Sequence, residues 1–417
     1  MSKNKFYIII GFVILSMTQL FAQKTSLEEV VEIIKKNNPQ LKMYDDEIKS
    51  MDSLAKGAKS WMNPQLSSGF FMTPYNTHLW KPNEMNSGMG SFMIGITQMI
   101  PNPKKQKSEF LYMSAMSEVE KENKKSDINQ LISIAKSNYY QWIILDKKIA
   151  IVHENLDLLS YMIKSMEVRY QYNMDKLSTY YKAQSQFSSL QSMIVMLENE
   201  VIQKRIILNT VMARSKETPL EIDTLFQLKT YDIYLKDSTI ISSKRSDIGA
   251  INKTIGLNQL KINLEKSKKL PEFGIKYDHM IPFGNNTQQF NLMLMVNIPM
   301  PWSTKMNDAS IQSINLKNEA LEWQKEMIVN ETEGMLASMD IELKNLKKQY
   351  AISENNIIPA LKKNYQTSLL SWQNNTGNLF EVLDAWETLN MAQLDALDKL
   401  QQILKVQVEI EKQLEIL

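Results

Sequence analysis

The chain carries one local pattern twice, and this duplication limits the folds open to it more than any other feature. Residues 168–183 align with residues 370–385, about 200 residues further along. Landmarks upstream repeat as well, since Pro101 corresponds to Pro299. A unit of this length is far longer than the roughly 20–50 residues of solenoid repeats. The sequence therefore predicts two similar halves that pack side by side.

Each half has the same predicted order of elements: a helix, a β-hairpin and a very long helical hairpin. The predicted ranges are 23–215 for the first half, with a β-hairpin at about 65–100 and a helical hairpin at 104–215, and 246–417 for the second half, with a β-hairpin at about 272–298 and a helical hairpin at 302–417. The expected fold is therefore mainly α-helical with a small β part.

The helical hairpins are indicated by a long stretch without helix breakers. From Lys104 to Thr218 there is no Gly or Pro, and apolar residues recur at spacings of three and four. A helix over 105–171 would be roughly 100 Å long at 1.5 Å per residue. Helices of that length are stable only in bundles or coiled coils, so we expect them to pack against one another.

The segments between the prolines alternate between apolar and polar residues, which is typical of strands with two different faces. Residues 290–298 show the pattern most clearly. The apolar positions, which we expect to face lipid if the strands enter a membrane, are Phe92, Ile94, Ile96, Phe273, Ile275, Tyr277, Phe290, Leu292, Leu294 and Val296.

Two interpretations of these strands remain open. They could form an ordinary antiparallel sheet with one wet face, or they could enter a membrane. Four strands cannot close a barrel, because even small barrels need about eight. An open sheet edge in lipid would leave backbone groups without hydrogen bonds. If the strands enter a membrane, several copies of the chain must therefore share one barrel.

The start of the chain and its composition narrow the class of protein. Residues 1–22 have the charged start and apolar run of a secretory signal peptide, with a single anchoring helix as the alternative. There is no Cys, which excludes a disulfide framework and a thiol metal site. The 48 basic and 46 acidic side chains nearly balance, so no nucleic-acid partner is expected.

The turn of the second helical hairpin carries a recognisable motif. It reads Trp372-Gln-Asn-Asn-Thr-Gly377-Asn-Leu-Phe-Glu381-Val-Leu-Asp384-Ala385. With the duplicated order of elements, this motif resembles the TolC-like outer-membrane efflux proteins, also called outer membrane factors. The resemblance covers nearly all of the chain after residue 22.

The resemblance implies a homotrimer in the outer membrane that extends into the periplasm. Each copy would give four strands to one shared transmembrane β-barrel and its helical hairpins to a periplasmic α-barrel. Residues 216–245 would form an equatorial insert between the two halves. The implied partners are outer-membrane lipid, a periplasmic adaptor (membrane fusion) protein and an inner-membrane pump.

The motif also implies where the site residues lie. Glu381 and Asp384 correspond to the acidic ring of the family's periplasmic aperture, where carboxylates attract cations. The alternative is that both are ordinary solvated acids on a helix face. The residues expected in the two hairpin turns are Asn173, Asp175, Asn375 and Gly377.

Methionine is abundant around the strands. Met93, Met293 and Met295 fall on the polar faces that would line the lumen, and thioethers are soft ligands suited to Cu(I). The simpler alternative is that Met fills space, as it does in many cores. We expect no resident metal and no cofactor. No Ser/His/Asp arrangement or phosphate-binding loop is present, so an enzyme is not expected.

The leading hypothesis is the outer-membrane channel of a tripartite export system. It would conduct substrates passively and be gated at the periplasmic helical tip by the adaptor and pump. A channel for secreting protein or polysaccharide is a variant of this hypothesis. The alternative from another class is a soluble periplasmic coiled-coil adaptor or scaffold.

Overall fold

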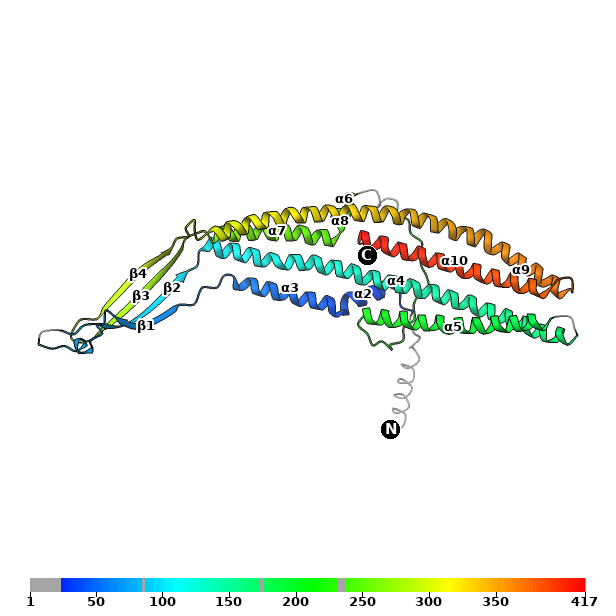
Figure 1. Ribbon diagram of the computed structural model, residues 1–417, viewed down its shortest axis with the longest axis horizontal. Helices are drawn as coiled ribbons and strands as arrows, with labels where there is room; N and C mark the ends of the chain where they lie inside the picture. The colour runs from blue at the N-terminus through cyan, green and yellow to red at the C-terminus, as the bar shows by residue number, and fades with distance from the viewer. Residues whose placement is uncertain (1–23, 85–86, 173–175, 232–237, 417) are drawn as a thin grey trace, which may run out of the picture. The chain divides into compact units, whose positions relative to one another are not determined.

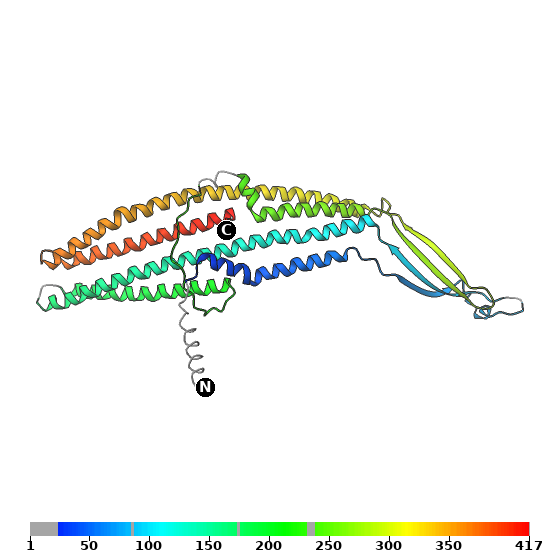
Figure 2. The same ribbon diagram turned by 180° about the vertical axis from the view of Figure 1, so that it is seen from behind.

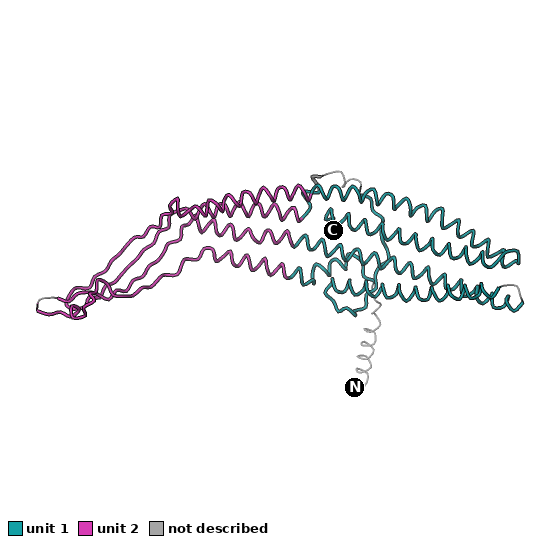
Figure 3. The backbone as a smooth tube through the Cα atoms, in the orientation of Figure 1, with its two compact units in different colours: residues 1–42, 124–245, 329–417 teal, residues 43–123, 246–328 magenta. Residues whose placement is uncertain are grey.

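In the computed structural model, residues 24–84, 87–172, 176–231 and 238–416 are described. The signal-peptide prediction at 1–22 falls outside these residues. The chain divides into two compact units (Figure 3): unit 1 comprises Met1–Lys42, Lys124–Arg245 and Val329–Leu417, and unit 2 comprises Met43–Asn123 and Ser246–Ile328. Each unit therefore takes segments from both predicted halves.

Unit 2 contains one antiparallel sheet of four strands in the order β1-β2-β3-β4 (Figure 1). The strands are β1 (Gln65–Phe71), β2 (Ser91–Ile100), β3 (Glu272–Pro282) and β4 (Gln289–Asn297). A 3₁₀ turn, η1 (Thr77–Trp80), lies in the loop between β1 and β2. Pairing of β2 with β3 joins the two predicted hairpins into one sheet, which confirms the small β part of the expected fold.

The register places apolar side chains on one face of all four strands. Ile96 lies opposite Leu66 on one side and opposite Tyr277 on the other, and Tyr277 in turn lies opposite Leu292. Because directly opposed residues point to the same face, this row of apolar side chains crosses the whole sheet. This face, which we call the apolar face, also carries Ser68, Gln98 and His279, and its apolar residues are Leu66, Phe70, Phe92, Ile94, Ile96, Ile100, Phe273, Ile275, Tyr277, Ile281, Phe290, Leu292, Leu294 and Val296.

The opposite face of the sheet is polar and contains a buried carboxylate. Asp278 is 2% exposed and lies against Gly95 on β2. A Cβ at Gly95 would lie 2.2 Å from Asp278 Oδ1 and 2.7 Å from Ser67 Oγ, so only glycine fits between these side chains. Lys276 Nζ lies 3.1 Å from Asp278 Oδ2 and balances its charge.

The helices of unit 2 are most of α3 (Pro39–Gly57), α7 (Ser246–Ser267), and the first parts of α4 (Pro103–Gln171) and α8 (Lys305–Ile352). Each of them is followed or preceded by a strand of the sheet: α3 leads to β1, α4 follows β2, α7 leads to β3 and α8 follows β4. The junctions are fastened by polar contacts. Asn102 Nδ2 donates to the carbonyl of Pro271 at 3.0 Å, and Lys105 pairs with Glu272.

Unit 1 is built from two helical hairpins and shorter segments. The remaining part of α4 lies beside α5 (Leu177–Val211), and α9 (Ile358–Gln373) lies beside α10 (Leu379–Leu414) in both views (Figures 1 and 2). One apolar core joins the four helices and includes Leu159, Leu190, Trp372 and Trp386. Unit 1 also contains α2 (Leu27–Asn37) and α6 (Ser238–Lys244).

The first arm of the helical hairpin expected at 302–417 is not one uniform helix. A π-helical turn, η2 (Ser353–Ile357), separates α8 from α9, and Pro359 lies at the start of α9. Proline lacks an N–H and crowds the preceding turn, so the helix widens just before it. Among the residues that the structure describes, no helix has a stretch long and apolar enough to cross a membrane.

A buried carboxylate on α10 ties three segments of unit 1 together. Glu411 is 5% exposed. It accepts hydrogen bonds from Lys136 Nζ of α4 at 2.7 Å, Lys229 Nζ at 2.6 Å and the Tyr231 hydroxyl at 2.9 Å. Burial alone would raise the pKa of Glu411, but the bonds from the two lysines outweigh it and hold the pKa below its ordinary value.

This carboxylate should make folding of unit 1 sensitive to acid. Because the pKa of Glu411 is lower in the folded chain, its contribution to stability is full above the unfolded value of 4.5 and is lost as pH falls through the folded value. Glu411→Gln should also destabilise the chain, by roughly 3–5 kcal/mol, because Lys136 stays buried without a counter-charge. Urea unfolding between pH 3 and pH 7 measures both effects, and an unchanged midpoint in Glu411→Gln would contradict the assignment.

Candidate functional site

The apolar face of the sheet is exposed over most of its area. Leu294 is 82% exposed, and Leu66, Phe70, Phe290 and Leu292 are each more than half exposed. Soluble monomers rarely expose apolar patches of more than a few hundred Å², and larger ones mark interaction with lipid or protein. The residues expected to face lipid thus lie together on one face, and that face needs an apolar cover.

Both edges of this sheet are open. Within the described residues, β1 pairs with β2 alone and β4 pairs with β3 alone. The outer side of each edge strand therefore presents backbone N–H and C=O groups without strand partners. Leu66 and Phe70, which lie on β1 beside one open edge, were not assigned to this face from the sequence because β1 alternates weakly.

The three methionines considered as lumen ligands all lie on the polar face. They occupy different rows of the sheet, however, because Met93 lies opposite Met280, Met293 opposite Lys276 and Met295 opposite Gly274. Within one chain they form no single cluster. In the described part of the chain, no group of three or more His, Asp or Glu side chains could hold a metal ion.

The turn of the second hairpin depends on two residues of the motif. Asn375 has a φ of 58°, the left-handed region that Asn tolerates better than most residues. Gly377 lies against the end of α9, where a Cβ would stand 2.8 Å from Ser371 Cβ. The N–H groups of Thr376 and Gly377 both donate to the Ser371 carbonyl, which closes the turn.

Arg169, near the end of α4, fastens the first hairpin to this turn. Its guanidinium donates from Nη2 to Asn375 Oδ1 at 2.7 Å. Its Cζ lies 4.8 Å from the ring centroid of the buried Trp372, so the guanidinium also makes a cation–π contact. Arginine suits this position because a planar cation can stack and donate at once. Of the turn residues expected in the first hairpin, Asn173 and Asp175 lie outside the described residues.

Glu381 and Asp384 lie in the first turns of α10, just after its N-cap. The Asn378 side chain accepts from the Phe380 N–H and begins the helix. Glu381 and Asp384 are exposed and three residues apart, so they share one side of the helix, while Val382 and Leu383 are buried. Neither carboxylate has an ion-pair partner among the described residues, so both charges are available to solvent.

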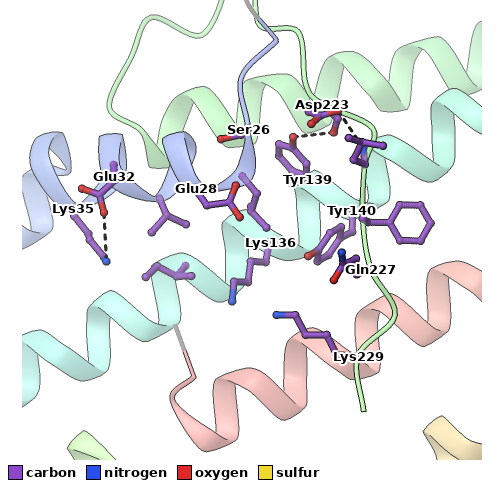
Figure 4. Close-up of a pocket in the computed structure, with 15 residues that line it drawn as sticks. Ser26, Glu28, Glu32, Lys35, Lys136, Tyr139, Tyr140, Asp223, Gln227 and Lys229 are labelled. Carbon is purple, nitrogen blue, oxygen red and sulfur yellow. Dashed lines mark hydrogen bonds and ion pairs between the residues drawn. The ribbon is translucent and has the colours of Figure 1, made fainter. Parts of the chain in front are cut away.

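A cavity of about 690 Å³ lies in unit 1 between α2, α4 and the segment 223–229 (Figure 4). Tyr139 closes one side, its hydroxyl lying 2.8 Å from the carbonyl of Asp223 and 3.0 Å from that of Thr25. Burial raises the pKa of Tyr139 to about 12, so the hydroxyl keeps its proton.

The three lysines that line this cavity already pair with carboxylates of the protein. Lys136 and Lys229 reach toward each other in Figure 4, and both pair with Glu411. The third lysine, Lys35, lies 3.7 Å from Glu32. Ion pairs within the protein thus use the cations that a ligand would need, and we assign no ligand to this cavity.

The contact of Arg169 with the second hairpin should order the turn. Replacing Arg169 with Ala removes a charged hydrogen bond and a cation–π contact, each of which contributes about 1–2 kcal/mol. Backbone amides at 374–377 should then exchange with solvent roughly tenfold or more faster in hydrogen–deuterium exchange. Lys164→Ala, an exposed change on the same helix, is the control. Equal exchange in the two variants would show that Arg169 does not hold the turn.

The chain matches one known family and the fold of several solved channels. Residues 30–214 match the family described as outer membrane efflux protein. VceC of Vibrio cholerae is similar in structure with a TM-score of 0.73 over 93% of this chain and 95% of that chain, at 12% sequence identity. No curated protein sequence matches the chain significantly.

Two other solved structures have the same fold. CusC has a TM-score of 0.74 over 95% of this chain and 95% of that chain, at 14% identity. The MtrE outer membrane channel of Neisseria gonorrhoeae has a TM-score of 0.71 over 93% of this chain and 88% of that chain, at 14% identity.

The family match and the fold agree with each other. The matched family consists of transport channels, so the expectation that the chain is not an enzyme is confirmed by the match. The resemblance drawn from the duplicated order and the hairpin-turn residues is confirmed as well: the chain matches the outer membrane efflux protein family in sequence over residues 30–214 and shares the fold of the solved TolC-like channels over most of its length.

Proposed function

We propose that three copies of this chain assemble into one channel through the outer membrane, and that this channel is the outer-membrane part of a tripartite export system. The observation that carries the proposal is the four-stranded sheet with one exposed apolar face and two open edges. Lipid covers such a face, and only a closed barrel satisfies the edges inside lipid.

Pooling of strands follows from this constraint. Three copies supply twelve strands, enough to enclose a lumen, whereas four strands cannot close. In the closed barrel, β4 of each copy pairs with β1 of the next. The apolar face turns outward, and the polar face with Asp278, Lys276 and the methionines lines the lumen.

The helices form the part of the channel that extends into the periplasm. In this proposal the hairpins of three copies surround a tunnel, and their tips meet a periplasmic adaptor and an inner-membrane pump. The family match and the long hairpins of unit 1 support this arrangement. The channel conducts passively, and the pump supplies the energy.

Gating is proposed at the hairpin tips. The contact of Arg169 with Asn375 and Trp372 holds the two hairpins of one copy together. An adaptor that binds more tightly when this contact is broken shifts the equilibrium between closed and open tips toward the open state. The change in the free-energy difference between the two states equals the difference between the adaptor's binding free energies for them. Glu381 and Asp384 then ring the aperture with up to six carboxylates in three copies.

The two faces of β4 should respond differently to a charge. Leu294→Lys places an ammonium on the apolar face, which costs about 2–4 kcal/mol at the bilayer midplane. We expect few heat-resistant trimers and little protein in the outer-membrane fraction. Met295→Lys changes the neighbouring residue on the polar face and should assemble normally.

Membrane fractionation of the two variants and of wild type distinguishes an outer-membrane channel from a soluble periplasmic protein. Equal assembly of Leu294→Lys and Met295→Lys would contradict the facing of the strands. Wild-type chain found dissolved in the periplasm as a monomer would favour a soluble coiled-coil protein instead.

Removal of the aperture carboxylates should change ion selectivity. In planar bilayers, the double variant Glu381→Ala/Asp384→Ala should lose cation preference several-fold, because crowded carboxylates concentrate cations at a narrow opening. Glu387→Ala, which removes an acid that already pairs with Lys182 and Gln186, is the matched control. Unchanged reversal potentials in the double variant would place both residues away from the aperture.

A further inference from the structure

The end of the sheet from which the helices start is strongly basic. We call this region the collar and define it as residues 56–62, 101–109, 265–272 and 302–308. It contains the lysines Lys56, Lys59, Lys104, Lys105, Lys107, Lys266, Lys268, Lys269 and Lys305, against the acids Glu109, Glu265, Glu272 and Asp308. The collar thus has a net charge of +5, whereas the whole chain has +2.

The strand register brings these four segments to the same end of the sheet, where the strands meet the helices. Ile100 at the end of β2 lies opposite Phe273 near the start of β3, and Glu272 lies opposite Asn297 at the end of β4. Gln98 Nε2 donates to the Met62 carbonyl at 3.0 Å and holds the segment before β1 at the same level. The lysines therefore lie beyond the same strand ends.

Internal ion pairs account for only part of this charge. Lys105 pairs with Glu272, Lys268 with Glu265, and Lys269 with Asp308. The other collar lysines have no ion-pair partner in the part of the chain that the structure describes. They are exposed: Lys56, Lys59, Lys104, Lys107, Lys266 and Lys305.

Two of these lysines line a groove on a defined side of α4. Lys104 and Lys107 flank a groove of about 300 Å³ between α4 and α7, with Leu111, Leu260 and Asn263. Lys105 and Glu109 lie on the opposite side of α4, and Lys105 pairs there with Glu272, whose position on β3 belongs to the polar face. The groove therefore lies on the side of α4 that points away from the polar face.

Exposed tryptophans accompany the lysines. Trp61 precedes β1 and is 60% exposed, and Trp302 follows β4 and is 73% exposed. Aromatic residues of this kind gather at the level where a bilayer changes from acyl chains to headgroups. The opposite end of the sheet lacks the charge, since the loop residues 72–90 contain one lysine and one acid, Lys81 and Glu84.

We propose that the collar binds the phosphate groups of anionic phospholipids in the leaflet that faces the periplasm. The proposal rests on the proposed function, because it needs the apolar face to be in the membrane. The occupant follows from charge complementarity and from position. Lys104 and Lys107, which have no ion-pair partner among the described residues, lie on the outward side of α4 beyond the apolar face and at the level of the tryptophans, where lipid phosphates lie.

The test measures which lipids the assembled, detergent-purified protein retains. Native mass spectrometry with equal amounts of phosphatidylglycerol and phosphatidylcholine of one chain length should show a preference for phosphatidylglycerol. The double variant Lys104→Gln/Lys107→Gln should lower that preference by roughly tenfold or more. Each lysine near an anionic surface contributes about fivefold in affinity, and the variant removes two of them. Lys104→Arg/Lys107→Arg should retain it.

The matched control is Lys362→Gln/Lys363→Gln, which removes the same charge from two exposed positions on α9. It should keep the full lipid preference. The proposal is overturned if wild type retains both lipids equally, if the groove variant keeps the preference, or if millimolar glycerol phosphate abolishes it, which would indicate a site for small anions. Failure of wild type to form membrane trimers would instead contradict the proposed channel.

Discussion

Backbone hydrogen bonding at the edges of the sheet is the constraint on which the function of this chain depends. In water, the outer N–H and C=O groups of β1 and β4 could bond to solvent, and four strands would be a complete structure. Beside the apolar face this solution fails, because Leu66 on β1 and Leu294 on β4 carry that face to both edges. The face needs a cover and the edges need partners at the same time. In the proposed channel, lipid covers the face and identical copies in a closed ring pair the edges.

The strand faces were predictable because they depend on a local period of two. Phe290 to Val296 alternate within one strand, and no distant information is needed to place them on one face. The pairing of β2 with β3 joins residues about 180 positions apart, and nothing local specifies it. The same pairing places His279 inside β3, opposite Ile94 on one side and Phe290 on the other.

The candidate site divides in the same way. Glu381, Asp384, Asn375 and Gly377 belong to a contiguous motif, so their positions near the turn followed from the sequence. The role of Arg169 was not predictable from a local motif. Its partners Trp372 and Asn375 are about 200 residues away in the sequence and are brought close only by helix packing. One signal was available: Arg169 lies within the duplicated segment and aligns with Ser371, so a charge replaces a small residue where the two turns differ.

The positions of the charged residues say more about the binding partners of this chain than its net charge does. The near balance of 48 basic and 46 acidic residues gave no reason to expect nucleic acid, and it concealed a collar of net charge +5 that the remaining residues offset. The two kinds of lysine site differ physically. At Glu411, the buried Lys136 and the half-exposed Lys229 come from two segments and share one carboxylate, so both charges are neutralised within the fold. Around the strand ends, exposed lysines outnumber the acids that could pair with them. Mutual repulsion makes such a cluster unfavourable in an isolated chain, and an external anionic surface removes that cost.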